Sequence, residues 1–408
     1  MKKRIYLDHA ATTYLDPRVK KAMEVFWLKE FGNPSSLYLE ARKAKKAIED
    51  SRKKIAELIN AKPEEIIFTA GGTESDNLAI FGVANGVGKF ASLKTDTKGN
   101  LTEAKLPSAK ISGSPHIITT KFEHHAVLNS CKELEKRGFK VTYLDVGKEG
   151  IVKPKDVKKA LRPETILVSI MFANNEIGTI QPIAEISKIV HEKNALFHTD
   201  ACQAAGYLDL DVKKLGVDLM TVNGSKIYGP KGIGFLYAKK GVKLQPILFG
   251  GEQERKMRPG TENVPAIAGL ARALEISQKN REKESRRVTV LRDYFIKRLV
   301  TEIPKTFLNG EPVQRLANNI NVSILGVEGE SVVLYLDEAG ISCSTGSACT
   351  SASLEPSHVI MALAKPHEYG HGSLRFTLGR RNTKKDIDYV LKVLPPIIKK
   401  LRSISAVT

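Results

Sequence analysis

Short apolar strands that alternate with amphipathic helices are the feature that most constrains this fold. Residues 64–70 (EEIIFTA) are predicted to form a buried strand, and residues 75–84 (SDNLAIFGVA) the helix that follows it. Parallel strands need long, usually helical, crossover connections, so this order predicts an α/β fold with a mostly parallel central sheet and helices on both faces. Further predicted strands are HIITT (116–120), KVTYLDV (140–146), TILVSIMFA (165–173), ALFHTD (195–200), LMTV (219–222) and GFLYA (234–238), with helical stretches between most of them, including 125–138 and 183–194.

The pattern changes near residue 266. A long charged helical stretch at 270–300 is followed by shorter helical and strand-like pieces, which predicts a smaller α+β domain. We expect an N-terminal segment, 1–20, that contributes to this small domain, a large domain at 21–265 and the small domain itself at 266–408. Residues 86–114 are rich in Gly, Lys, Thr and Ser, and this composition predicts a long surface loop.

Composition excludes several classes of protein. The chain has 408 residues, of which 42% are hydrophobic, so it can bury a large core. The opening MKKRIYLDHAATT does not resemble a secretory signal, and no apolar run approaches the roughly 18 residues of a transmembrane helix. We therefore expect a soluble, cytoplasmic protein with no membrane partner. The four cysteines lack the spacing of a zinc site or a disulfide framework.

The chain is strongly basic, with 64 Lys and Arg against 45 Asp and Glu and a net charge of +19. Such an excess fits a solvated lysine-rich surface, an acidic protein partner or nucleic acid. The basic residues are spread along the chain, and no RNA-binding motif accompanies them. A direct nucleic-acid partner is therefore the least favoured of the three.

Residues at predicted strand ends suggest a ligand site, because open α/β sheets bind ligands at the carboxyl ends of their strands. Gly71-Gly72-Thr73 opens a helix after a strand and can cradle a phosphate, although an ordinary strand–helix turn looks the same. Asp200 can pair with a cationic ring nitrogen or cap the next element. Lys226, in a Gly-rich turn, can form a Schiff base or face solvent. Together, a cradle, an acid and a lysine are what a pyridoxal phosphate (PLP) site needs.

A longer series of motifs makes this interpretation specific. The motifs are YLDHAATT (6–13), FGNPSS (31–36), FTAGGTESDNLAI (68–80), EHHAVL (123–128), NNEIGTIQPI (174–183), HTDACQ (198–203), KIYGPKG (226–232), MRPGTENV (257–264), GSACTSASLEPSHV (346–359) and LRFTLGR (374–380). With these motifs in this order, the sequence resembles the NifS/IscS-type cysteine desulfurases, which are PLP-dependent enzymes of the aminotransferase class V family with fold type I. The resemblance runs from Tyr6 to about Leu401 and places the cofactor in the large domain.

The resemblance implies a role for each matching residue around the cofactor ring and the substrate. Lys226 would hold PLP as a Schiff base and move the Cα proton, and Asp200 would pair with the ring nitrogen. His124 would stack on the ring and serve as an acid or base, and Gln203 would hydrogen-bond the phenolic oxygen. The remaining roles are those of Asn175, which would assist at the cofactor or substrate, and Arg375, which would clamp the substrate carboxylate.

The resemblance also implies which residues surround the phosphate. These are Gly72, Thr73, Asn223 and Ser225, with Thr261 supplied by the partner subunit of a homodimer. Two of them depart from the usual pattern: Ser225 stands where many family members have His, and Asn223 replaces a hydroxyl residue. Both side chains can still donate hydrogen bonds to phosphate.

Cys349 is the residue that distinguishes among the reactions open to a PLP enzyme of this kind. It lies in a run of small polar residues, 344–353, whose lack of periodicity predicts an exposed loop in the small domain. The resemblance implies that its thiolate takes the sulfur of L-cysteine as a persulfide and leaves L-alanine, and it leaves open that Cys349 also ligates a transient iron–sulfur cluster. The sulfur would pass to an iron–sulfur scaffold or a tRNA-thiolation enzyme. The alternative, a selenocysteine lyase or another class V PLP enzyme, needs Lys226 and Asp200 but not Cys349.

Overall fold

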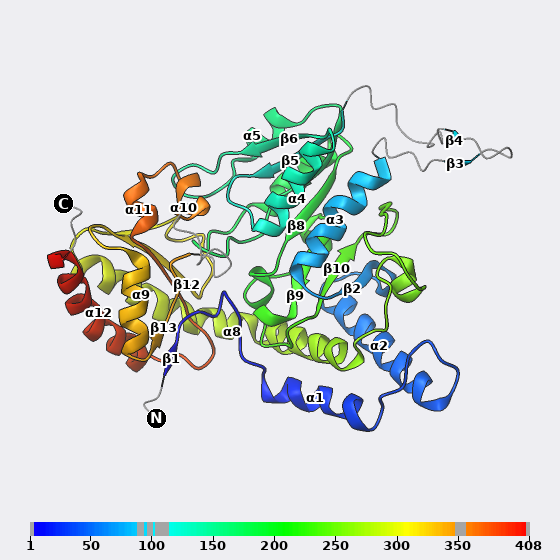
Figure 1. The fold of residues 1–408 in the computed structure, drawn as a ribbon, viewed down its shortest axis with the longest axis horizontal. Helices are drawn as coiled ribbons and strands as arrows, with labels where there is room; N and C mark the ends of the chain where they lie inside the picture. The colour runs from blue at the N-terminus through cyan, green and yellow to red at the C-terminus, as the bar shows by residue number, and fades with distance from the viewer. Residues whose placement is uncertain (1–3, 88–93, 96–100, 103–113, 347–355, 405–408) are drawn as a thin grey trace.

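The computed structural model describes residues 4–87, 94–95, 101–102, 114–346 and 356–404. Figure 1 shows a large α/β body beside a smaller one, with helix α8 (Val264–Glu302) running from the first into the second. The other helices are α1 (Pro17–Leu28), α2 (Leu39–Leu58), α3 (Gly72–Val87), α4 (His125–Lys136), α5 (Pro154–Ala160), α6 (Ile183–His191), α7 (Val212–Leu215), α9 (Gly329–Glu338), α10 (His358–Ala362), α11 (His367–His371) and α12 (Lys384–Ile404).

Within the described residues the strands form four sheets, of which a seven-stranded one is the centre of the large body. Its order is β2-β10-β9-β8-β7-β5-β6, and its strands are parallel except for β10, which runs antiparallel to both neighbours. The predicted α/β class with a mostly parallel sheet is confirmed. The strand bounds are β1 (Ile5–Tyr6), β2 (Ile66–Thr69), β3 (Lys94–Thr95), β4 (Leu101–Thr102), β5 (His116–Thr120), β6 (Lys140–Leu144), β7 (Thr165–Ser169), β8 (Leu196–Asp200), β9 (Leu219–Asn223), β10 (Gly234–Ala238), β11 (Thr306–Leu308), β12 (Asn319–Ile324), β13 (Ile341–Ser342) and β14 (Ser373–Thr377).

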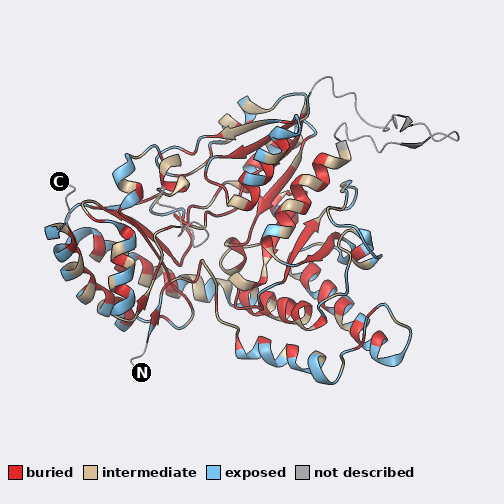
Figure 2. Ribbon diagram, viewed as in Figure 1, coloured by how far each residue is buried: buried red, intermediate tan, exposed pale blue. Residues whose placement is uncertain are grey.

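Both faces of the large sheet are covered, because successive strand residues point to opposite sides. Leu167 of β7 packs with α3 and α4, whereas the next residue, Val168, belongs to the core on the other face with residues of α2, α6 and α8. This double coverage explains why the strands read as continuous apolar runs. Figure 2 shows the sheet strands almost wholly buried.

The smaller body is built on the antiparallel sheet β11-β12-β14. Its core joins the second half of α8, through Val288 and Leu299, to α9 and α12, and it includes Ile5 and Leu7 near the N-terminus. Strand β1 pairs there in parallel with β13. The domain boundaries at 20/21 and 265/266 stay predictions.

Several predicted boundaries differ from the structure; the strand expected at 165–173, for example, ends at Ser169. The strand expected at 64–70 is limited to β2, because Pro63, Glu64 and Glu65 form a short 3₁₀ turn before it. The loop expected at 86–114 begins later, since Gly86 and Val87 still belong to α3. Most of that segment (88–93, 96–100 and 103–113) lies outside the described residues.

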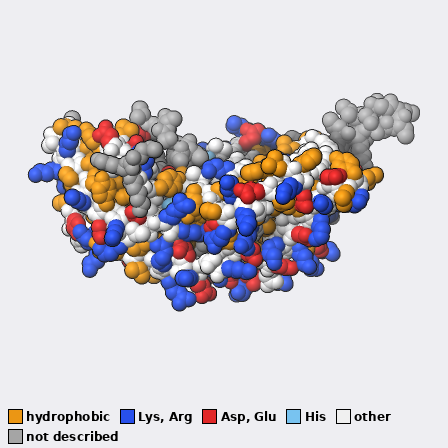
Figure 3. All heavy atoms as spheres, turned by 90° about the horizontal axis from the view of Figure 1, so that it is seen from below, with side chains coloured by type: hydrophobic (Ala, Val, Ile, Leu, Met, Phe, Trp, Pro, Cys, Tyr) orange, Lys and Arg blue, Asp and Glu red, His pale blue; other side chains and the backbone are white. Residues whose placement is uncertain are grey.

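The surface carries its charge in mixed form. On the face in Figure 3, Lys and Arg side chains alternate with Asp and Glu. Helices α2 and α8 contain such pairs one turn apart, for example Lys46–Asp50 at 2.6 Å and Arg286–Glu282 at 3.2 Å. In the part of the chain that the structure describes, no helix is both long and apolar enough to cross a bilayer.

Candidate active site

A cavity of about 190 Å³ opens at the carboxyl ends of the central strands. The N-terminal segment, through Ala10 and Ala11, and β14 of the smaller body, through Arg375, also line it. Most of the predicted site residues meet here. The lining residues are Ala10, Ala11, Gly72, Thr73, Asp76, His124, Met171, Asn175, Asp200, Cys202, Gln203, Asn223, Lys226 and Arg375.

Two predicted residues lie outside this cavity, and a third is not among the described residues. Ser225 lines an adjoining cavity, which shares Gly72, Thr73 and Asn223 with the first. Thr261 is exposed just before α8 and lines neither of these two cavities. Cys349, and with it the predicted cluster ligand, lies outside the described residues.

Lys226 ends a short 3₁₀ turn, Gly224–Lys226, that follows β9 directly. A Cβ on Gly224 would lie 2.9 Å from the carbonyl oxygen of Pro230, so only glycine fits this tight return of the chain. The turn is capped by Asn223, whose Oδ1 accepts the backbone N–H of Ser225 at 3.1 Å. Lys226 Nζ donates to the carbonyl oxygens of Ala10 and Ala11 at 2.9 and 2.6 Å, which holds the amine at the cavity wall.

Asp200 and His124 come from neighbouring strand ends. Asp200 closes β8, is 6% exposed and accepts the backbone N–H of Cys202 at 2.8 Å. His124 caps α4 by accepting the N–H of Ala126 on Nδ1 at 3.2 Å, which leaves Nε2 to carry the proton. Burial lowers the pKa of His124, and the charge of Lys226 lowers it further, while that of Asp200 opposes both. The imidazole is therefore neutral at neutral pH.

The start of α3 forms the predicted cradle. Gly71 has φ +148°, in the region that glycine alone visits readily, and the helix begins at Gly72. A Cβ on Gly72 would lie 2.8 Å from Cys202 Sγ, so the buried thiol fits against a residue without a side chain. The N-terminus of α3 thus presents backbone N–H groups and the residue Thr73 to the cavity, as an anion requires.

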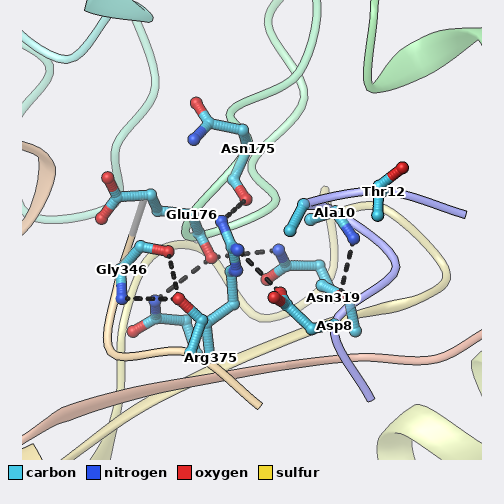
Figure 4. A network of polar contacts seen from close by, with 12 residues as sticks. Asp8, Ala10, Thr12, Asn175, Glu176, Asn319, Gly346 and Arg375 are labelled. Carbon is cyan, nitrogen blue, oxygen red and sulfur yellow. Dashed lines mark hydrogen bonds and ion pairs between the residues drawn. The ribbon is translucent and has the colours of Figure 1, made fainter. Parts of the chain in front are cut away.

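Arg375 lies at the opposite wall, on β14. Figure 4 shows its guanidinium between Asp8 and Asn175: Nη2 donates to Asp8 Oδ1 at 2.8 Å and Nη1 to the carbonyl oxygen of Asn175 at 3.0 Å. Nε has no hydrogen-bond partner among the described residues. Asp8 and Asn175 thus fix the orientation of the guanidinium, and Arg375 lines the cavity in this orientation.

Two buried acids beside Asp200 were not assigned a role from the sequence. Asp76 is 1% exposed in the cavity wall, and burial together with the charge of Asp200 raises its pKa well above the usual value. Glu123 accepts hydrogen bonds from Thr120 Oγ1 at 2.8 Å and from the N–H of Met171 at 3.0 Å, and burial raises its pKa to about 8. Asp76 belongs to the motif at 68–80 and Glu123 to the motif at 123–128, but only packing reveals that they share one buried region with Asp200.

These residues fit pyridoxal phosphate. The helix start suits a phosphate, Asp200 suits a protonated ring nitrogen, and the amine of Lys226 faces the same space as both. The glycines of the cradle leave the room that a side chain at Gly72 would fill.

Known proteins resemble this chain over most of its length. The chain matches the family described as aminotransferase class-V over residues 5–390. It is 53% identical over 405 residues to a protein of Dictyoglomus turgidum named cysteine desulfurase IscS, covering 99% of this chain and 97% of that protein. A protein of the same name from Methanosarcina thermophila is 52% identical, covering 100% of this chain and 95% of that one.

Solved structures also resemble the chain. A NifS-like protein is 34% identical, with a TM-score of 0.87 over 98% of this chain and 100% of that one. A second, described as SspA in complex with cysteine, is 34% identical, with a TM-score of 0.77 over 92% of this chain and 99% of that one. The predicted fold type is thus shared over the full length.

Proposed function

Because the chain belongs to the aminotransferase class-V family, we propose that it is a PLP-dependent cysteine desulfurase, which converts L-cysteine to L-alanine and transfers the sulfur. One observation carries the proposal: Lys226, Asp200 and the Gly72–Thr73 helix start line a single cavity. The names of the relatives support the reaction, and the neighbour described in complex with cysteine supports the substrate.

Different residues of the cavity would bind different parts of the cofactor. Lys226 provides the amine for its aldehyde, and Asp200 the counter-charge for its ring nitrogen. Gly72, Thr73 and Asn223 would hold its phosphate, and Ser225 would add a hydroxyl from the adjoining cavity. When bound, PLP supplies an electron sink that stabilises negative charge at the Cα of the substrate.

The side chains around this space then orient the substrate and move its proton. Arg375 would bind the substrate carboxylate, since Asp8 and Asn175 hold its guanidinium in the wall of the cavity. Burial lowers the pKa of His124, so its imidazole is unprotonated at neutral pH. It can therefore accept a proton from the substrate thiol or amine. Lys226 removes the proton at Cα. Asn175 and Gln203 complete the polar wall.

Sulfur transfer requires a second nucleophile, and we assign it to Cys349, which lies outside the described residues. Its thiolate attacks the sulfur of the bound cysteine, an S–S bond forms, and the C–S bond of the substrate breaks. The electron pair of that bond passes to the substrate carbon, which is then protonated to give alanine. The product on the protein is a Cys349 persulfide, ready for an acceptor thiol.

A homodimer belongs to the same proposal. Thr261 is exposed and absent from its own subunit's cavity, as expected of a residue that serves the partner. Large apolar side chains are exposed nearby: Leu37 and Phe249 are 89% and 88% accessible. Their segments adjoin, since Pro34 and Ser35 line one groove with residues 252–255. A second copy of the chain would cover this surface.

The acceptor of the sulfur would be a protein thiol, on an iron–sulfur scaffold or a tRNA-thiolation enzyme, in the cytoplasm. The names of the relatives support a role in iron–sulfur assembly.

The proposal is tested with the purified protein and L-cysteine. We expect a visible absorption band from bound PLP, a change in that band on adding L-cysteine, and equal amounts of alanine and sulfide in the presence of a reductant. Cys349→Ser should keep the band and lose sulfide production. A yellow protein that forms alanine without Cys349 would instead favour a selenocysteine lyase or another class V enzyme, and a protein that takes up no PLP would overturn the proposal.

A further inference from the structure

The segment 254–258 begins with three residues whose backbone is strained. Glu254, Arg255 and Lys256 are consecutive non-glycine residues with φ of 45°, 56° and 68°, all in the left-handed region. Each such residue costs on the order of 1 kcal/mol unless its surroundings fix it. Here the Glu254 carboxylate is buried and accepts hydrogen bonds from Arg52 at 2.6 and 2.8 Å. An ion pair thus holds the strained turn in place.

The same segment is bonded to both sides of the phosphate cradle. Before the cradle, Glu254 accepts the backbone N–H of Phe68 in β2 at 2.8 Å. After it, Arg258 Nε donates to Glu74 Oε1 at 3.0 Å, in the first turn of α3. Glu74 Oε2 in turn accepts the N–H of Ala70, the residue just before the two glycines. The segment therefore spans the turn that forms the cradle.

Glu74 is an unfavourable neighbour for a phosphate. It lines the adjoining cavity together with Gly72, Thr73 and Ser225. A carboxylate in the first helical turn is itself stabilised by the positive end of the helix, so it competes electrostatically with an anion bound there. Like charges at such short range repel appreciably when partly shielded from water, and the Glu74 and Arg258 side chains are only 18% and 28% exposed.

We propose that Arg258 is a positioning residue of the phosphate cradle: it neutralises Glu74 and holds that carboxylate on the Ala70 N–H, so that the helix start can accept a phosphate dianion. The inference rests on the proposed PLP function and extends it to a pair of residues outside the main cavity. Arg258 also lies three residues before Thr261, so the same contact fixes the base of the loop that the proposed partner subunit would use.

A double-mutant cycle tests the charge relationship. The variants are Arg258→Met, Glu74→Gln and the two combined, prepared as PLP-free protein and titrated with PLP and, separately, with inorganic phosphate. Arg258→Met leaves the Glu74 charge uncompensated, so we expect both dissociation constants to rise about tenfold. Added salt should narrow the loss, because salt screens repulsion between partly exposed charges. The combined variant should return to within about threefold of the wild type.

A charge-matched control separates this effect from net charge. Arg286→Met removes one cation from an exposed pair, in which Arg286 and Glu282 are 80% and 74% accessible, and it should bind PLP as the wild type does. If the wild type binds PLP normally but the combined variant binds it no better than Arg258→Met does, repulsion by Glu74 is not the cause of the loss. That result would overturn this proposal and leave the proposed function standing. A wild type that binds neither PLP nor phosphate would overturn the proposed function as well.

Discussion

Asp8 and Arg375 form a nearly buried ion pair between segments that are 367 residues apart in the chain. Their side chains are 15% and 2% exposed, and Oδ1 and Nη2 lie 2.8 Å apart. The pair ties the N-terminal segment to the sheet of the smaller body and orients the guanidinium at the cavity wall. A residue near the start of the chain therefore determines how the proposed carboxylate clamp is presented.

Replacing Arg375 by Lys should weaken substrate binding more than catalysis. A lysine ammonium cannot reproduce the planar guanidinium, which contacts both Asp8 and Asn175 and which we propose binds the carboxylate. We expect the KM for L-cysteine to rise at least about tenfold, or about 1.4 kcal/mol, with a smaller change in kcat. Steady-state kinetics measure both. The control is Asp8→Asn, which keeps the guanidinium; an equal rise in KM there would show that Arg375 acts mainly through the ion pair.

Gly72→Ala should disturb the cradle through a single contact. The new methyl group would lie 2.8 Å from Cys202 Sγ, closer than real side chains approach. We expect PLP affinity to fall and the free energy of unfolding to drop by about 1–3 kcal/mol, the usual effect of overpacking. Both are measurable by cofactor titration and urea denaturation. Adding Cys202→Ala should restore most of the loss, and failure to do so would show that the contact with Cys202 is not the cause.

Glu123 should make the protein less stable as the pH rises. Burial raises its folded pKa to about 8, so between its ordinary value near 4.3 and pH 8 the folded state binds more protons than the unfolded state. The free energy of unfolding should fall across this window by up to roughly 1.4 kcal/mol per pH unit. Glu123→Gln, a neutral mimic, should flatten the slope and exceed the wild type at pH 8 in urea denaturation. Equal slopes would mean that Glu123 ionises normally in the fold.

His198 should act in the opposite direction, at acid pH. It is fully buried between Ser169 Oγ and Thr221 Oγ1, at 2.8 and 3.1 Å, and burial lowers its pKa to about 4. Its contribution to stability is complete above pH 6.5 and is lost as the pH falls toward 4, because the unfolded state then binds a proton that the folded state excludes. His198→Gln should reduce the dependence on pH between 6.5 and 4 in urea denaturation. An unchanged acid slope would assign the loss to other groups, such as His116.

The exposed apolar surface should hold two copies together. Phe249→Asp, at a side chain 88% accessible in the single chain, should shift the protein toward monomers in sedimentation experiments, because burying a carboxylate in an interface is costly. Leu334→Asp on α9, where the side chain is 69% accessible, is the matched control and should leave the dimer intact. A dimer that survives Phe249→Asp would move the proposed interface to another face.

Much of the fold and the candidate site follows from local patterns. The order of strands and helices, and the positions of Gly72, Asp200, Asn223 and Lys226 at strand ends, are visible in the sequence, because apolar periodicity and turn residues act over a few positions. The structure brings these residues to one cavity because the strands of the parallel sheet end at a common edge.

Contacts between distant segments depended on tertiary structure. The pairing of Asp8 with Arg375, the bond between Glu74 and Arg258, and the fit of Cys202 against Gly72 each join residues whose spacing in the chain carries no signal. The protonation state of a buried acid also depends on tertiary structure: the pKa of Glu123 is raised because folding buries its carboxyl group. The sequence alone determined which elements form and which residues end them. Packing in three dimensions decided which side chains come into contact and which buried groups are charged.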